Sequence, residues 1–351
     1  MSRIYLDHAA TSPLRPEARA AMEQGFASWA NPSSPHAEGR KARSLLEDAR
    51  ARIKAALDWS GELIFTSGAS ESAELALTRA QAGARLVSTV EHDAILKAVP
   101  DAERLPVRPD GALDLETLCE AVRRERPLVA VQQVNSETGN AQDLAAVHAI
   151  VRDAGGLLLA DCAQSAGRFA LPPCDMAIVS AHKFGGPIGI GALLVRDFAM
   201  LAPTGGHERG YRRGTENLPG ALGMAAALEA CATPYVAPEV LEPLDSLAAD
   251  CRAAGGTWLG DILSDPMPYV RALAMPTMSA SAQVMRFDMA GLAVSQGSAC
   301  SSGTMKTSHV LQAMGMDEGI AANTIRVSLG WSTTREEVTR FCQRWLEFAD
   351  A

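Results

Sequence analysis

Short apolar runs alternate with longer amphipathic segments along the first two thirds of the chain. Most apolar runs have the length of a strand and lead into a helical pattern through small polar residues or glycine. Predicted strands begin near Leu63, Arg85, Leu128, Leu157, Ala177 and Gly189, while predicted helices cover 15–28 and 37–57 and begin near Ser70, His92, Asp114, Leu144 and Asn217. This alternation predicts an α/β fold, in which a mainly parallel sheet lies between helices on both faces.

The pattern changes near Cys231. The segment Thr233-Pro234-Tyr235-Val236-Ala237-Pro238 has the composition of a linker. Beyond it the regular alternation is lost, and the last predicted helix covers 335–348. We therefore expect a large domain that ends near residue 232 and a smaller α+β domain after it.

One lysine stands out, because only five of the 32 Lys and Arg residues are lysines. Lys183 follows the apolar run Met176–Val179, which is typical of a buried strand. Asp161 ends a second apolar run, Leu157–Ala160. Open α/β sheets bind ligands at the carboxyl ends of their strands, so we expect both side chains to border one crevice.

A lysine and an aspartate in one crevice are the minimum requirement for pyridoxal phosphate. A lysine at the end of a buried strand can lose its proton and attack an aldehyde. An aspartate keeps the nitrogen of the pyridine ring protonated. Each residue also has a structural explanation, because Lys183 could extend its ammonium group to solvent and Asp161 could cap a helix.

The segment after another predicted strand, near the start of the large domain, is suited to bind an anion. Glu62–Thr66 is a predicted strand, and Ser67-Gly68-Ala69-Ser70 opens the next helix. The N–H groups and dipole of a helix N-terminus attract phosphate, and the Ser70 hydroxyl adds a hydrogen bond. Ser180 and His182 could donate to the same phosphate. An ordinary capped helix explains the segment equally well.

Cys300 lies in a stretch of small residues, Gln296-Gly297-Ser298-Ala299-Cys300-Ser301-Ser302-Gly303. This composition predicts a mobile surface loop. Cysteines are usually buried, and exposure favours reactivity because the thiolate is the nucleophile. We therefore expect a reactive thiol rather than an incidental surface cysteine.

Charge and cysteine content limit the class of protein. The net charge is −9 without a basic block, which argues against nucleic acid or an anionic membrane as a direct partner. No run approaches the roughly 18 apolar residues of a membrane span, and the start lacks an apolar signal region. The seven cysteines and seven histidines show no metal-ligand spacing, so no metal is implied and a reducing cytoplasm is expected.

A series of motifs in order gives the chain a resemblance to a known family. The motifs are Tyr5–Thr11, Asn31–His36, Thr66–Ser72, Glu91-His92, Val134–Gly139, Asp161–Gln164, Ser180–Lys183, His207–Gly210, Arg213–Asn217, Gly297–Gly303 and Ile325–Gly330. Together they resemble the cysteine desulfurases, which are enzymes of the class-V aminotransferase type and of pyridoxal phosphate fold type I. The resemblance covers nearly the whole chain.

The resemblance implies a role for each candidate residue. Lys183 would hold the cofactor, Asp161 would pair with its ring nitrogen, and Gln164 would bond to its phenolic oxygen. His92 would stack on the ring and transfer protons. Ala69 would also contact the cofactor. The phosphate would be held by Ser70, Ser180, His182 and, from the neighbouring subunit, Thr215, and the substrate carboxylate by Asn135 and Arg326.

The resemblance also implies a reaction and its partners. L-cysteine would become L-alanine, while the sulfur passes to Cys300 as a persulfide and then to an acceptor protein, a scaffold or a sulfur carrier. Iron–sulfur cluster assembly, thio-cofactor synthesis and tRNA thiolation are open destinations. A homodimer is implied, because Thr215 would complete the partner's site. Residues 1–14 would join 233–351 in the small domain, which carries the Cys300 loop, and 15–232 would form the large domain.

Two other interpretations stay open. The chain could be a selenocysteine lyase or a small-amino-acid aminotransferase of the same group, or a catalytically quiet paralogue that acts as a binding protein. It departs from the family pattern at Ala73 and Glu74, where asparagines are usual, and at Met305–Thr307, where Glu-Pro is usual. These departures leave the predicted cofactor contacts intact.

Overall fold

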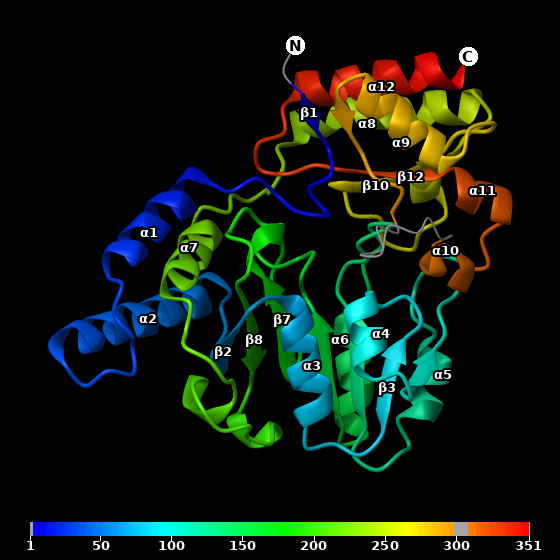
Figure 1. Ribbon diagram of the computed structural model, residues 1–351. Helices are drawn as coiled ribbons and strands as arrows, with labels where there is room; N and C mark the ends of the chain where they lie inside the picture. The colour runs from blue at the N-terminus through cyan, green and yellow to red at the C-terminus, as the bar shows by residue number, and fades with distance from the viewer. Residues whose placement is uncertain (1–2, 298–307, 351) are drawn as a thin grey trace.

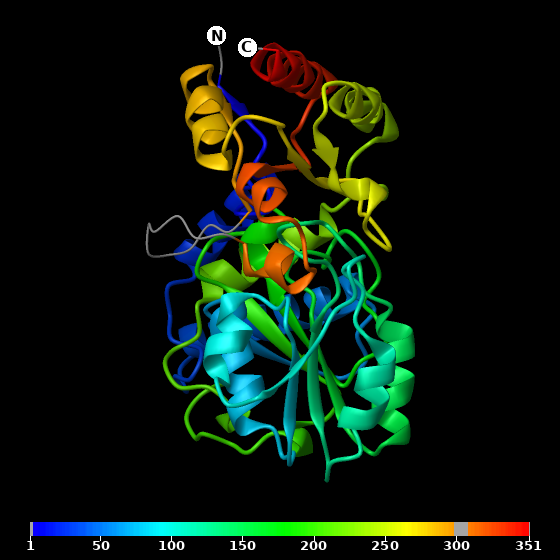
Figure 2. The same ribbon diagram turned by 90° about the vertical axis from the view of Figure 1, so that its right-hand side faces the viewer.

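The computed structural model describes residues 3–297 and 308–350. Within them, a large sheet with helices on both faces lies beside a smaller region that has its own sheets and helices (Figure 1). The chain crosses between the two regions near its N-terminus, because strand β1 lies in the smaller region and helix α1 lies against the large one. The side view shows the C-terminal helix at the far end of the smaller region (Figure 2).

The large sheet has seven strands. Their order is β2 (Glu62–Thr66), β8 (Gly191–Val195), β7 (Met176–Ser180), β6 (Leu157–Asp161), β5 (Leu128–Gln132), β3 (Arg85–Ser88) and β4 (Glu103–Leu105). Strand β8 runs antiparallel to both of its neighbours, and every other pairing is parallel. The prediction of an α/β fold with a mainly parallel sheet is confirmed.

Two cores cover the two faces of this sheet. One face packs against α1 (Pro16–Ala27), α2 (Ala37–Ala56), α5 (Leu115–Ala121), α6 (Leu144–Asp153) and α7 (Leu218–Glu229), and the other against α3 (Ala69–Arg79) and α4 (Asp93–Ala98). Successive side chains of a strand alternate between them: Leu63 and Phe65 lie in the first core and Ile64 in the second. Because both faces are covered, the central strands β5, β7 and β8 are buried along their whole length.

The smaller region is built around a three-stranded antiparallel sheet. It contains β9 (Thr257–Trp258), β10 (Val270–Ala274) and β12 (Thr324–Ser328), with β10 in the centre, and helices α8 (Pro238–Ala253), α9 (Ala280–Met289), α10 (His309–Ala313), α11 (Glu318–Asn323) and α12 (Arg335–Ala349). Strand β1 (Ile4–Tyr5) pairs in parallel with β11 (Leu292–Ala293). The largest buried side chains of its core include Trp345, Phe287 and Phe341.

Short 3-10 turns complete the secondary structure: η1 (Ala181–Lys183), η2 (Phe198–Met200), η3 (Glu208–Gly210) and η4 (Leu259–Asp261). Among the described residues, none of the helices is long and apolar enough to span a membrane. The boundary between 15–232 and the small domain of 1–14 and 233–351 remains our proposal.

Candidate active site

Two adjacent cavities lie at the carboxyl ends of β5, β6 and β7. The first has a volume of about 350 Å³ and is bordered by Asp161, at the end of β6, and by Lys183, in the turn after β7. The second has a volume of about 260 Å³ and is bordered by Asn135 and Arg326. Lys183 and His92 border both cavities. The structure therefore brings the predicted lysine and aspartate into one crevice.

The Lys183 amino group lies against the N-terminal segment. Nζ donates to the carbonyl oxygens of Ala9, at 2.7 Å, and Ala10, at 3.1 Å. Burial lowers the pKa of Lys183 from 10.5 to about 8, and the charges of Arg326 and Arg168 act in the same direction. About a tenth of this lysine therefore carries a free amine at pH 7, far more than an exposed lysine would, and the free amine is the form that attacks a carbonyl group.

Asp161 is a carboxyl group in surroundings that disfavour its charge. Burial raises the pKa of Asp161, while the nearby His92 and Lys183 lower it. Its Oδ1 accepts the N–H of Ala163 at 2.9 Å. Residues 162–175, all of them described, contain no helix that Asp161 could cap. A cation in the first cavity would stabilise this carboxylate.

His92 caps helix α4 and borders both cavities. Its Nδ1 accepts the N–H of Ala94 at 3.1 Å, so Nε2 carries the hydrogen of the neutral ring. Burial lowers the pKa of His92, which favours the neutral ring at pH 7. The preceding Glu91 is completely buried, and burial together with Asp161 raises its pKa well above the ordinary value.

The side chain of Gln164 is held by the Ala9 carbonyl and by Arg168, which no sequence motif marks. Its Nε2 donates to the Ala9 carbonyl at 2.8 Å, the same oxygen that accepts from Lys183. Arg168, one turn further along, donates from Nη1 to Oε1 of Gln164 at 3.2 Å, and its Nη2 donates to the Lys183 carbonyl. Arg168 is buried and lies 4.8 Å from the ring centre of Tyr269. It therefore fixes both Gln164 and the Lys183 backbone.

The expected phosphate-binding residues gather at the other end of the first cavity. Ala69 and Ser70 lie in the first turn of α3, after Gly68, and border the cavity together with Ser180 and His182. Burial and the Lys183 charge lower the pKa of His182 to about 4, so its ring is neutral at pH 7. This end therefore offers neutral hydrogen-bond donors and a helix N-terminus to an anion.

Arg326 is buried within strand β12. Nη2 lies 2.6 Å from Oδ1 of Asp7, and Nη1 donates to the Ser136 carbonyl at 2.8 Å, while Nε has no partner. The side chain of Asn135 is bonded to the protein: Oδ1 accepts the N–H groups of Glu137 and Thr138, both at 2.9 Å. Arg326 is thus the better placed of the two for a carboxylate.

Cys300 lies outside the described residues, and so do residues 298–303 of the loop predicted around it. Gly297, the last described residue before that segment, borders the second cavity, as does His309 after it. The predicted role of Cys300 stays a prediction.

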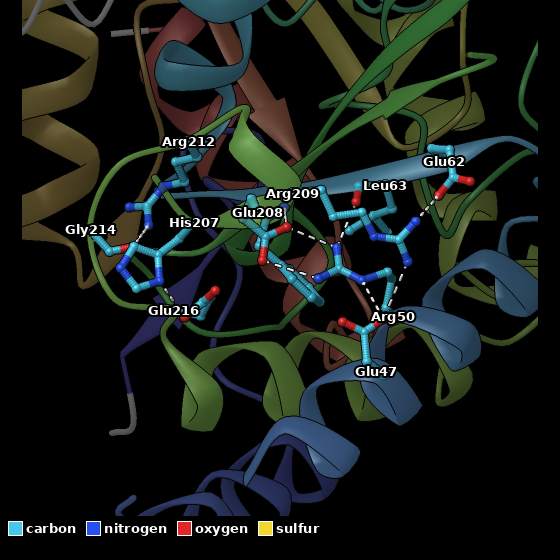
Figure 3. A network of polar contacts seen from close by, with 11 residues as sticks. Glu47, Arg50, Glu62, Leu63, His207, Glu208, Arg209, Arg212, Gly214 and Glu216 are labelled. Atoms are coloured by element: carbon cyan, nitrogen blue, oxygen red, sulfur yellow. Dashed lines mark hydrogen bonds and ion pairs between the residues drawn. The ribbon is translucent and has the colours of Figure 1, made fainter. Parts of the chain in front are cut away.

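Thr215 is exposed and borders neither cavity of its own chain. The turn that leads to it is anchored by a buried ion pair, in which Arg50 of α2 bonds to both carboxylate oxygens of Glu208 at 2.8 and 3.1 Å (Figure 3). Arg212 bonds to Glu71 in the first turn of α3 at 3.0 Å. The segment is therefore fixed beside the start of α3, which borders the first cavity.

The sequence shows some of these relations only indirectly. Arg168 follows the Asp161–Gln164 motif, but nothing in its local pattern distinguishes it from the other arginines. Glu91 and Glu137 lie within the quoted motifs, and only their burial and contacts show that they belong to the site.

Comparison with known proteins agrees with this arrangement. The sequence matches the family described as aminotransferase class-V over residues 4–341. A cysteine desulfurase of Cereibacter sphaeroides is 36% identical over 367 residues, which cover 98% of this chain and 95% of that protein.

Two solved structures share the fold. A NifS-like protein from Rickettsia africae superposes with a TM-score of 0.88 at 27% identity, covering 99% of this chain and 100% of that one. SspA in complex with cysteine superposes with a TM-score of 0.80 at 28% identity, covering 93% of this chain and 99% of that one. The predicted fold, that of the type I pyridoxal phosphate enzymes, is confirmed. The chain belongs to the class-V aminotransferase family, among the cysteine desulfurases of the NifS and IscS type.

Proposed function

We propose that this protein is a pyridoxal phosphate-dependent cysteine desulfurase, which converts L-cysteine to L-alanine and receives the sulfur on Cys300. The observation that carries the proposal is the position of Lys183. An amine with a pKa of about 8 lies where a cavity with a buried carboxyl group meets a cavity with a buried arginine. The names of the relatives support the same activity.

The residues around the first cavity fit the cofactor. Lys183 would bind its aldehyde, and Asp161 would supply the negative charge that a protonated ring nitrogen requires. Gln164 has a second amide hydrogen for the phenolic oxygen, and His92 offers a ring for stacking. Ala69, Ser70, Ser180 and His182 would hold the phosphate. When bound, the cofactor withdraws electrons from the substrate carbon that carries the amino group.

The second cavity fits the amino acid. Arg326 would hold its carboxylate, and the free amine of Lys183 would accept the proton from its α-carbon. The Cys300 thiolate then attacks the substrate sulfur. An S–S bond forms, the C–S bond breaks, and its electron pair stays on carbon, which takes up a proton to give the methyl group of alanine. The sulfur remains on Cys300 as a persulfide.

The experiment that tests this function measures alanine and sulfide released from L-cysteine, with and without a thiol reductant. We expect one alanine per active site without the reductant and continued release with it. Absence of alanine would reject the proposal. Cys300→Ala should stop persulfide formation, whereas an aminotransferase would keep its transamination with this substitution.

We also propose a homodimer in the cytoplasm, in which Thr215 of each subunit reaches the phosphate in the other. The persulfide would be delivered to an acceptor protein, either a scaffold or a sulfur carrier. This part of the proposal rests on the family resemblance and on the exposure of Thr215.

A further inference from the structure

A histidine and a carboxylate without a role in the proposed reaction border the second cavity. His309 lies at the start of α10, and Glu137 lies in the loop after β5. Nδ1 of His309 is 3.9 Å from Oε1 of Glu137. Lys183 and Arg326 border the same cavity.

A backbone contact fixes the tautomer of His309. Its Nε2 lies 3.0 Å from the carbonyl oxygen of Glu91. A carbonyl oxygen can only accept, so Nε2 carries the hydrogen and Nδ1 of the neutral ring keeps its lone pair. Nδ1 is therefore a hydrogen-bond acceptor, and it is the nitrogen that lies beside Glu137.

Glu137 is fixed by its other oxygen. The Ser308 hydroxyl donates to Oε2 of Glu137 at 2.5 Å. The loop that carries Glu137 also holds Arg326, which donates to the Ser136 carbonyl at 2.8 Å. The carboxylate and the arginine therefore keep a fixed relation to each other across the cavity.

The charges around His309 are of both signs. Glu91, Asp93 and Glu137 are the acidic residues that border the cavity; burial raises the pKa of Glu91, and the pKa of Asp93 is lowered by its hydrogen bond with Lys97 and, to a smaller extent, by His309. His92, Lys183 and Arg326 border the same cavity. Glu137 is the group that lies beside Nδ1.

We propose that Nδ1 of His309 accepts the hydrogen bond of the substrate thiol, while the contact of Nε2 with the Glu91 carbonyl holds the ring. The inference rests on the proposed function and adds a thiol-binding subsite to it. An amino acid held by its carboxylate at Arg326 and by its amino group near Lys183 directs its side chain toward the remaining wall, where His309 offers an unused acceptor. No covalent bond is made or broken in this interaction.

The test compares two amino acids that differ by the thiol. Holoenzyme with Cys300→Ala is titrated with L-cysteine and with L-alanine, and binding is followed through the cofactor absorbance. We expect His309→Gln to raise the Kd for L-cysteine roughly three- to tenfold, the range of one hydrogen bond, and to leave the Kd for L-alanine unchanged. His148→Gln, the same substitution on α6 outside both cavities, should change neither Kd.

An equal change for both amino acids, or no change for either, would overturn the thiol subsite. Nitrogen-15 NMR of the holoenzyme gives a second readout: the His309 signal, assigned by its loss in His309→Gln, should show hydrogen on Nε2. Hydrogen on Nδ1 would also overturn the proposal. Alanine formation by the wild-type enzyme separates the desulfurase proposal from the thiol subsite. Absence of alanine rejects the desulfurase itself. Alanine formation, together with equal effects of His309→Gln on the Kd values of L-cysteine and L-alanine, rejects only the subsite.

Discussion

At the scale of single residues, Lys183 shows how burial prepares a side chain for chemistry. Its pKa of about 8 in the folded protein lies below the ordinary 10.5, because burial disfavours the ammonium form. Between these two values the unfolded chain binds more protons than the folded one. The stability of the cofactor-free protein therefore rises with pH across this window. Below pH 8 the cost of burying the charged lysine is fully present, so Lys183 destabilises the fold most there.

We predict that Lys183→Met removes this dependence. In cofactor-free protein, the free energy of unfolding of the wild type should gain about 2 kcal/mol relative to the variant as the pH rises from 7.5 to 10. Urea unfolding at several pH values measures the difference. Lys41→Met, which removes an exposed lysine of α2, is the control and should follow the wild type. Parallel curves for wild type and Lys183→Met would contradict the lowered pKa.

At the scale of elements, the turn before Thr215 depends on one buried ion pair. Glu208 and Arg209 both have positive backbone φ angles, 46° and 55°, which residues other than glycine rarely adopt. Glu208 is held there by Arg50, and its Oε2 also accepts the N–H of Phe65 at 2.8 Å. The pair thus joins the turn to both α2 and β2.

We predict that Glu208→Gln destabilises the protein by about 3 kcal/mol, because it removes the buried partner of Arg50 and leaves only the more exposed Glu47 to balance its charge. Glu229→Gln is the matched control: it breaks the pair of Arg52, also on α2, with an exposed partner and should cost less than about 1 kcal/mol. Urea unfolding of holoenzyme gives both values. Equal effects of the two substitutions would show that burial does not distinguish the two pairs.

The local pattern of apolar residues predicted the strands that are buried at every position. The fully buried strands β5, β7 and β8 were found because every residue in them is apolar or small, or lies at the strand end. Strand β4 was missed, because Glu103 and Arg104 are exposed at the edge of the sheet. The pairing of β1 with β11 joins residues nearly a whole chain apart, which no local pattern reveals.

The site itself was predicted in part. Lys183 and Asp161 end buried strands, so their meeting follows from the parallel sheet. The contacts of Arg168 and the Arg326–Asp7 pair could not be predicted, because they depend on how distant segments pack. The assignment of individual roles came from the motifs rather than from the physical pattern.

At the scale of the molecule, three distant parts of the chain form the site: the N-terminal segment, strand β12, and the large region that carries Lys183 and Gln164. The N-terminal segment supplies the Ala9 carbonyl, which accepts from both Lys183 and Gln164. Strand β12 of the smaller region supplies Arg326, which bonds to Asp7 of the same N-terminal segment. The second cavity, which Ala9, Ala10 and Arg326 border, therefore exists only when both regions and the N-terminal segment are folded together.

The proposed dimer would add a fourth part, Thr215 of the other subunit, and this predicts complementation between two inactive variants. Lys183→Ala removes the cofactor lysine, and Thr215→Asp places a carboxylate where a phosphate is expected, so each homodimer should be inactive. In a mixed dimer, one site combines Lys183 of one subunit with Thr215 of the other, and about a quarter of the wild-type alanine production should return after random reassociation. Mixing either variant with a Lys183→Ala, Thr215→Asp double variant should restore nothing, because no site then holds both residues. If the two inactive single variants also restore nothing although mass spectrometry shows the mixed dimer, Thr215 acts within its own chain; an active Thr215→Asp homodimer would show that Thr215 has no role.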